Sequence, residues 1–480
     1  MLIRSLKNPL PIKLIKIHIF FLSFVYALDG DMYDLFLPNG MKVILMEKHS
    51  APKVGLGVYY NVGSHDEKWG QKGINKLIKR IIVTQGTDKF TFDELITKRH
   101  EFALGYGDSD GRDITYYYSE LPKDQLEFGL DFESDRMNNL IITNSKLNNA
   151  KQEFKIKYEE YHDNEMWVTF NNSLSPLLEK DHPYKIDEWG IWEQIDTLSI
   201  QTCQNYYNKY YTPNNAVLVI VGNIVPENVI NEIFQYFGSI PSNNEILIDP
   251  NLSFDKMSFI ESAEFNVINK NISMYHGVST IEFFMPSARS DDAILIGHLK
   301  NILNFDLNSN GLINKKFTKN NRQTHHTIFD DKFCMGRSSF LIGGVTFGKN
   351  LSIKKFSKSV LSGFKHIEKY GIDNDFLDLY KKSELLKIYK ENNKFYNIAN
   401  RLGKSELING DYNQYNRKME LLEELTNEDI KHIVKKYFHK DNMYTYLVSA
   451  NSDAKKWYTR LILLLAENII FRFYNPFQEF

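Results

Sequence analysis

The sequence predicts an α+β fold with two similar domains, each a mainly antiparallel sheet with helices packed on one face. Segments typical of strands occur in groups, and segments with apolar residues at helical spacing follow them. The second observation is an internal repeat, because the pattern that begins at Leu198 recurs 227 positions later at Leu425. The chain has 480 residues, which is long enough for two domains with cores of their own. These features are typical of the α+β class.

The repeat consists of a helix followed by a strand and lies near the end of each half. A fixed offset over this distance indicates two similar domains, not a short-period solenoid. We therefore expect an N-terminal domain over 30–241, a polar linker over 242–271 and a C-terminal domain over 272–452. The first copy contains Leu198-Ser199, Lys209-Tyr210-Tyr211 and Asn215, which match Leu425-Thr426, Lys436-Tyr437-Phe438 and Asn442 in the second.

The elements of the N-terminal domain can be predicted in chain order. Apolar strands flank the turn signal Pro38-Asn39-Gly40, and a further strand covers 54–62. Helical spacing of apolar residues predicts a helix over 73–83, with Ile74, Leu77, Ile78 and Ile81 on one face. The remaining expected elements are a strand at 114–118, helices from Leu121-Pro122 to Met137 and over 148–161 and 195–210, a buried strand at 216–221, and a helix at 226–237.

The first 28 residues resemble a signal sequence. Basic residues precede an apolar run over 17–28, which is too short to span a bilayer and ends before Asp29-Gly30-Asp31. Val25-Tyr26-Ala27 is a tolerable cleavage site. We therefore expect a secreted or periplasmic protein, while an uncleaved membrane anchor and an organellar presequence stay open as alternatives.

The C-terminal residues 453–480 form an apolar tail. Its segment 457–473, WYTRLILLLAENIIFRF, is too short and too charged to cross a membrane. A packed helix is expected there, and contact with a membrane surface is the alternative.

The composition excludes some classes of partner and site. The chain has 58 Lys and Arg against 60 Asp and Glu, so no net charge favours nucleic acid, and we expect no nucleic-acid partner. The two cysteines, Cys203 and Cys334, are too few for a disulfide framework and too far apart in sequence for a close metal-type pair.

Several short stretches occur in a characteristic order along the chain. They are LPNGMKVIL (37–45), YNVGSHDE (60–67) before Gly73-Ile74, DITYY (113–117), Leu121-Pro122, SDRM (134–137), HPY (182–184), YYTPNNAVLVIVG (210–222) and MPSARSDDA (285–293). Together they resemble the pitrilysin/insulinase family of zinc metallopeptidases, of the bacterial and mitochondrial-processing-peptidase type. The resemblance covers roughly 33–449 and implies two homologous domains that face each other like a clam shell around a chamber.

The family's active helix carries the zinc motif H-x-x-E-H, in which the two histidines share one helical face and the glutamate activates the bound water. In this sequence the corresponding positions are Lys76, Lys79 and Arg80. Three cations would repel a zinc ion, and none can act as the water-activating carboxylate. The resemblance therefore implies a member with a degenerate motif, no catalytic residues and no cofactor, although zinc is the family's cofactor.

Other family positions also differ. The third zinc ligand should lie within 152–160, where Glu153, Glu159 and Glu160 are the candidates, and we expect these carboxylates to form ion pairs with the cations opposite. The family's asparagine that binds the substrate backbone falls at or near Gly107. The family's Arg/Tyr pair in the second domain falls near Thr318 and His325.

Four functional hypotheses stay open. The first is the inactive subunit of a peptidase complex, which would share a chamber with an active subunit of the same family. The second is a protein that binds extended peptides without a partner. The third is an active zinc metalloendopeptidase with displaced ligands, and the fourth is a decaying relic. Peptides bind this family by adding to a sheet edge, and that mode of binding does not require catalysis.

Overall fold

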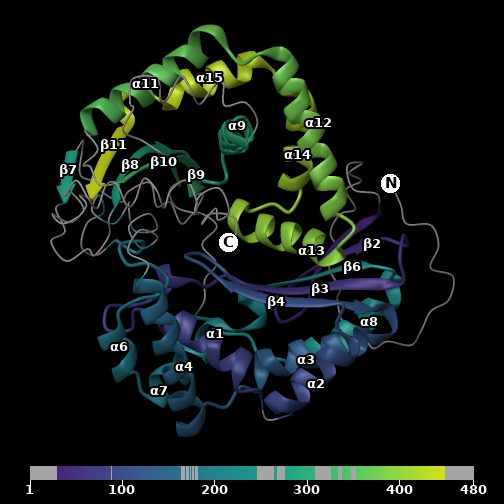
Figure 1. The fold of residues 1–480 in the computed structure, drawn as a ribbon. Coiled ribbons are helices and arrows are strands. Elements are labelled where there is room, and N and C mark those ends of the chain that lie inside the picture. Colours follow the sequence, from purple (N-terminus) through teal and green to yellow (C-terminus); the bar gives the residue numbers. More distant parts are fainter. Residues whose placement is uncertain are drawn as a thin grey trace.

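The computed structural model describes residues 30–87, 89–163, 182–245, 276–308, 326–332, 338–347 and 353–448, together with strand 264–267 and four isolated positions between 168 and 178. It contains two sheets, each with a layer of helices, stacked one above the other in Figure 1. The α+β class and the two-domain organisation predicted from the sequence are confirmed. The signal-like segment 1–28 and the tail 453–480 lie outside the described residues.

The first sheet has six strands in the order β1-β2-β6-β3-β5-β4. All neighbours are antiparallel except β2 and β6, which are parallel. The turn before β2 contains Gly40 with a φ of 84°, a left-handed conformation that glycine adopts without strain. The strands are β1 Met32–Phe36, β2 Lys42–Glu47, β3 Lys53–Tyr60, β4 Gly105–Asp110, β5 Thr115–Pro122 and β6 Ala216–Gly222.

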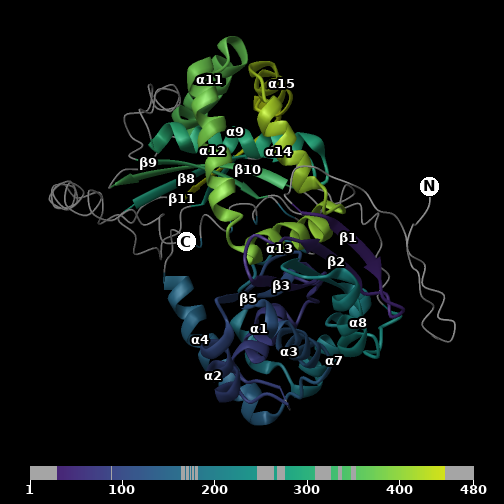
Figure 2. The ribbon, with the colours of Figure 1, turned by 90° about the vertical axis from the view of Figure 1, so that its right-hand side faces the viewer.

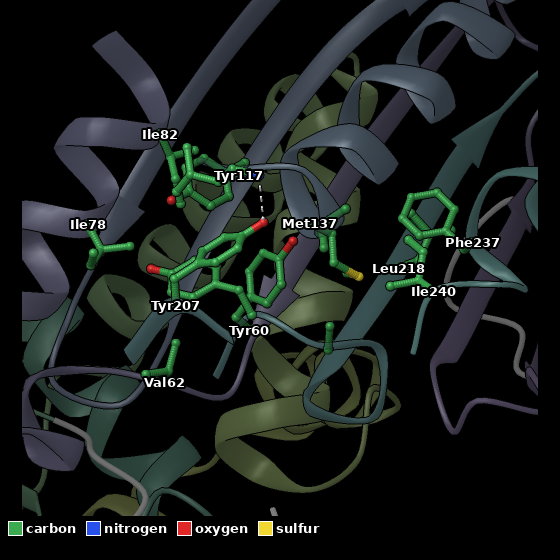
Figure 3. Packing of buried hydrophobic residues seen from close by; sticks show 14 of the residues in the cluster. Tyr60, Val62, Ile78, Ile82, Tyr117, Met137, Tyr207, Leu218, Phe237 and Ile240 are labelled. Carbon is green, nitrogen blue, oxygen red and sulfur yellow. Dashed lines mark hydrogen bonds between the residues drawn. The ribbon is translucent and has the colours of Figure 1, made fainter. Parts of the chain in front are cut away.

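Helices cover one face of this sheet and bury the apolar core of the first half. Ile78 and Ile82 of α1 lie with Tyr60, Tyr117 and other apolar residues of the sheet in this core (Figure 3). The predicted apolar face of 73–83 is therefore confirmed as buried. The helices are α1 Ile74–Thr84, α2 Phe92–Phe102, α3 Leu126–Asn138, α4 Asn144–Asp163, α6 Trp192–Thr197, α7 Ile200–Tyr210 and α8 Pro226–Phe237.

The second sheet repeats the topology of the first. Its order is β7-β11-β8-β10-β9, and only β7 and β11 are parallel, as β2 and β6 are in the first sheet. Strand β7 lies inside the range predicted as a linker. The strands are β7 Glu264–Val267, β8 His276–Met285, β9 His326–Lys332, β10 Ser338–Phe347 and β11 Met443–Val448, and the helices are α9 Asp291–Asn308, α11 Ile353–Tyr370, α12 Asn374–Glu391, α13 Phe395–Lys404, α14 Gln414–Glu424 and α15 Asn427–Tyr437.

The internal repeat is reproduced in individual hydrogen bonds. The Asn215 amide donates to the carbonyl of Tyr210, five residues earlier, at 2.8 Å, and to a carbonyl that follows β3 at 3.0 Å. The Asn442 amide likewise donates to Tyr437, five residues earlier, at 2.8 Å, and to a carbonyl of β8 at 2.8 Å. Each asparagine thus ties a helix end to the neighbouring strand, which explains why the same residue occurs at both positions.

One helix of the second half belongs structurally to the first sheet. Helix α13 packs on β3, β5 and β6, on the face opposite the other helices (Figures 1 and 2). The buried Glu120 carboxylate of β5 accepts the backbone N–H of Phe395 at 2.6 Å and the Lys53 ammonium at 2.8 Å. The first sheet therefore has the helical layer that the sequence predicts on one face, and α13 lies on its other face.

Two local predictions were wrong, and two elements were not predicted. Leu121 and Pro122 end strand β5 and do not begin a helix, because they pair with Val54 and Lys53. The helix expected over 195–210 is two helices, α6 and α7, separated at Leu198-Ser199, where the Ser199 hydroxyl caps α7. The sequence prediction also missed α2 and β4. Within the described residues, no helix is both long and apolar enough to cross a membrane.

Candidate functional site

The first turn of α1 is fixed by buried polar groups. The Glu67 carboxylate accepts the backbone N–H groups of Gly73 at 2.8 Å and Asn75 at 2.9 Å, two of the free donors at a helix start. The Asn75 amide donates to the Thr115 hydroxyl of β5 at 2.8 Å. Burial raises the pKa of Glu67 to about 8, and these two N–H groups oppose the rise. The helix that carries the degenerate motif is therefore held rigidly against the sheet.

Two of the three motif positions form a partly buried ion-pair network with strand β4. Lys76 Nζ lies 2.7 Å from the Asp110 carboxylate. Lys79 Nζ lies 2.8 Å from Asp110 and 2.8 Å from Asp108. Lys76 also lies over the Trp189 ring, 4.7 Å from its centroid. Each ammonium thus has at least one carboxylate, and the Asp110 side chain is only 3% exposed.

The electrostatics of this network favour the charged forms. Burial alone would raise the pKa of Asp110, but Lys76 and Lys79 outweigh burial and lower that pKa to about 2. Burial alone would lower the pKa of Lys79, but Asp110 and Asp108 outweigh burial and raise it. Asp110 is therefore ionised at neutral pH, and Lys79 is not available as a neutral base.

The third motif position pairs with helix α4. An Arg80 guanidinium nitrogen lies 3.7 Å from the Glu153 carboxylate. Of the three candidate third-ligand residues, Glu153 is the one that the structure places opposite α1. Glu159 is exposed, and Glu160 pairs with Lys157 on the surface at 2.8 Å. Arg80 and Glu153 thus form the ion pair expected from the sequence, whereas Lys76 and Lys79 use carboxylates that the sequence analysis did not identify.

The donor set at these positions does not fit zinc. Zinc is bound by imidazole, thiolate or carboxylate groups, and the three motif positions offer two ammonium groups and a guanidinium. The nearby carboxylates of Asp108, Asp110 and Glu153 are engaged with these three cations. Nowhere in the described part of the chain do three or more His, Cys, Asp or Glu side chains gather as metal ligands would.

Strand β4 is the outer strand of the first sheet, and within the described residues its far side has no strand partner. Such an edge offers unpaired N–H and C=O groups to an extended peptide. Gly107, at the family's substrate-asparagine position, lies in the middle of β4 and provides no side chain for this purpose. The positions Thr318 and His325 lie outside the described residues.

Asp108 and Asp110 are the site residues that sequence reasoning missed. The segment from Gly105 to Asp110 is rich in glycine and aspartate, which are depleted in strands, so the segment was not predicted as one. The available signal was spacing. Two aspartates two positions apart in a strand share a face, and two lysines three positions apart in a helix also share a face.

Comparisons with known proteins agree with this geometry. Residues 42–183 match the family model described as insulinase (peptidase family M16), and residues 197–303 match the model described as the peptidase M16 inactive domain. Together the two matches cover more than half of the chain.

Two curated relatives illustrate the sequence similarity. Zinc protease PqqE of Helicobacter pylori is 21% identical over 359 residues, covering 72% of this chain and 76% of that protein. The probable mitochondrial-processing peptidase subunit beta of Arabidopsis thaliana is 21% identical over 207 residues, covering 43% of this chain and 39% of that protein. The matched region is thus less than half of the plant protein.

Two crystal structures show the same fold. A protease from Helicobacter pylori superposes with a TM-score of 0.76 at 17% identity, covering 88% of this chain and all of that one. The periplasmic protease PqqL from Escherichia coli superposes with a TM-score of 0.65 at 15% identity, covering 92% of this chain and 50% of that one. At these identities the similarity establishes the fold alone.

Proposed function

Because this chain belongs to the pitrilysin/insulinase family of peptidases, peptidase family M16, we propose that it is a non-catalytic member that binds extended peptides as the inactive subunit of a peptidase complex. The observation that carries the proposal is the ion-pair network of Lys76, Lys79, Asp108 and Asp110. Two of its members, Lys76 and Lys79, occupy positions that the sequence resemblance assigns to a zinc ligand and to the general base, and the charges of the network are balanced.

The partner in this proposal is an active peptidase of the same family. The matched region is half of the E. coli protease PqqL, and the first half of PqqL alone matches 92% of this chain at a TM-score of 0.64. The plant relative is named as a subunit. A chain with one two-domain unit and no intact motif would complete a chamber with a second unit that carries H-x-x-E-H.

The ligand in this proposal is an extended peptide that pairs with β4. Within the described residues the outer edge of β4 has no strand partner, its backbone is held by β5, and the ion-pair network fixes it to α1. Backbone hydrogen bonds of this kind need neither a metal nor a base. The same edge favours the second candidate function, which is peptide binding without a partner.

For localisation, we propose that the chain acts outside the cytoplasm. The basic and apolar segment 1–28 supports this, and the similar E. coli structure is described as periplasmic. N-terminal sequencing of the protein from its native membrane and soluble fractions tests the proposal. A mature start after Ala27 supports export, whereas retention of residues 1–28 in a soluble protein contradicts it.

The decisive experiment measures metal and activity together. The purified chain is incubated with zinc, desalted and assayed for bound metal and for cleavage of a quenched fluorescent peptide library. We expect less than about one-tenth of an equivalent of zinc and no cleavage that a chelator inhibits. Zinc near one equivalent with chelator-sensitive cleavage would establish the alternative, an active enzyme with displaced ligands.

A second experiment tests the partner. The chain is isolated from its own cells under mild conditions, and bound proteins are identified. Recovery in equal amounts of a family member with an intact H-x-x-E-H motif supports the subunit function. Recovery of the chain alone, with peptide affinity retained, favours the binding protein that needs no partner.

A further inference from the structure

Four tyrosines form a continuous stack across the face of the first sheet that carries α13. We call Tyr59, Tyr116, Tyr118 and Tyr396 the tyrosine stack. Ring centroids are 5.5 Å apart for Tyr59 and Tyr116, 6.2 Å for Tyr116 and Tyr118, and 5.0 Å for Tyr118 and Tyr396. The angles between the planes of neighbouring rings are 21°, 26° and 17°, so each ring is stacked on the next. The stack begins in the buried core at Tyr59 and ends in half-buried rings beside β4.

The last two rings lie over strand β4 because that strand has almost no side chains on this face. Gly107 pairs with Tyr118, and a Cβ atom on Gly107 would lie 2.4 Å from the Tyr118 hydroxyl. A Cβ atom on Gly105 would lie 3.5 Å from the Tyr396 ring. The two glycines therefore let both rings extend toward the free edge of the sheet. A strand added at that edge would have every second side chain against them.

The rings are held in place by their surroundings. The Glu120 carboxylate accepts the backbone N–H of Phe395, which fixes the first turn of α13 and hence Tyr396. Lys404 Nζ lies 4.4 Å from the centroid of the Tyr116 ring. Pre-positioned aromatic surfaces contribute to binding without first losing side-chain freedom.

The opposite face of β4 has a different character. Tyr106, Asp108 and Asp110 lie on it, because each is an odd number of positions from Gly105 and Gly107. Arg99 lies over the Tyr106 ring, 4.6 Å from its centroid, and Asp108 pairs with Lys79. One face of an added strand would thus meet aromatic rings, and the other would meet charged side chains.

We propose that the tyrosine stack is a specificity site that selects extended peptides with aromatic residues at alternate positions and polar residues between them. This inference rests on the peptide binding proposed above and adds the class of peptide. Aromatic side chains would stack on Tyr118 and Tyr396 while the peptide backbone pairs with β4. Contacts between aromatic rings of this kind change affinity by about three- to tenfold.

The test uses two fluorescein-labelled ten-residue peptides and measures fluorescence anisotropy with the full chain. One peptide alternates Phe with Thr, and the second has Ser in place of every Phe. We expect the Phe peptide to bind at least about fivefold more tightly. Tyr118→Thr and Tyr396→Ser should each reduce this preference to about twofold or less. Tyr389→Ser is the matched control, because Tyr389 is 71% exposed on α12 and should leave the preference unchanged.

The outcomes separate the inference from the function on which it rests. Equal affinity of the wild-type chain for both peptides, or a preference that survives in folded Tyr118→Thr and Tyr396→Ser chains, overturns the specificity site and leaves peptide binding intact. A third peptide with N-methyl groups on alternate residues should bind about tenfold more weakly, because it loses backbone hydrogen bonds. Undiminished binding of that peptide, or no binding of any peptide, overturns the edge-strand mode itself.

Discussion

Lys79 Nζ lies 2.8 Å from the Asp110 carboxylate, so the motif helix α1 and the last residue of the edge strand β4 are joined by a partly buried ion pair. Lys76 and Arg80 bring the number of cations at the motif positions to three, and Asp108 and Glu153 bring the number of carboxylates beside them to three. Each of the three cations at the motif positions thus has a carboxylate partner in the structure.

The first prediction concerns Asp110→Asn. This substitution leaves Lys76 without its carboxylate and Lys79 with Asp108 only, so the free energy of unfolding should fall by about 2 kcal/mol or more. The triple substitution Lys76→Met, Lys79→Met and Asp110→Leu removes these charges together. It should lower the free energy of unfolding by less than Asp110→Asn does. Urea denaturation measures both. A single variant as stable as the wild type would show that the network contributes nothing.

The second prediction concerns acid. The folded-state pKa of Asp110 is lowered to about 2 from an ordinary 3.8, so its contribution to stability is present above about pH 4 and is lost as pH falls toward 2. This contribution amounts to about 2 kcal/mol. Between pH 5 and pH 2, the free energy of unfolding should fall less steeply with decreasing pH for Asp110→Asn than for the wild type. Parallel curves would contradict the assigned pKa.

The third prediction restores the motif. Lys76→His, Lys79→Glu and Arg80→His together, with Asp108→Ala and Asp110→Ser to remove the carboxylates left without partners, should bind about one equivalent of zinc. Glu153 should serve as the third ligand, so adding Glu153→Gln should weaken zinc binding at least about tenfold. Elemental analysis after dialysis checks both. A folded restored chain that takes up no zinc would argue against the placement of Glu153 opposite α1.

The fourth prediction compares the two copies of the repeat. Asn215→Ala should lower the free energy of unfolding by about 2 kcal/mol, because it leaves the carbonyls of Tyr210 and Asn61 without this donor in a buried site. Asn442→Ala should cost about 1 kcal/mol, because Asn442 is only half-buried. Thermal unfolding monitored by circular dichroism shows which variant is less stable. A larger loss of stability for Asn442→Ala than for Asn215→Ala would contradict the prediction.

Much of this fold could be predicted from local sequence patterns, and the reasons for the failures are physical. The apolar spacing of Ile74 to Ile81 predicted α1 because a helix buries one face whatever its neighbour is. The same logic could not find the partner of α13, whose apolar face packs on strands more than 170 positions earlier in the chain. Strand β4 was not predicted, because glycine and aspartate disfavour strands. In the structure, pairing with β5 and ion pairs with Lys76 and Lys79 stabilise it. The positive charges at the motif could thus be predicted from the sequence. The carboxylates that neutralise them could be identified only from the register of β4 in the structure.

The place of α13 also has a consequence for synthesis. Strand β6 completes the first sheet at Gly222, yet α13 begins only at Phe395, so more than 170 further residues must leave the ribosome before the helix reaches the sheet. Until then Tyr59, Val219 and other apolar residues of that face, which join the core of the second half, are open to water and to other chains. The nascent N-terminal half therefore exposes an apolar sheet face that can associate with other chains until α13 covers it.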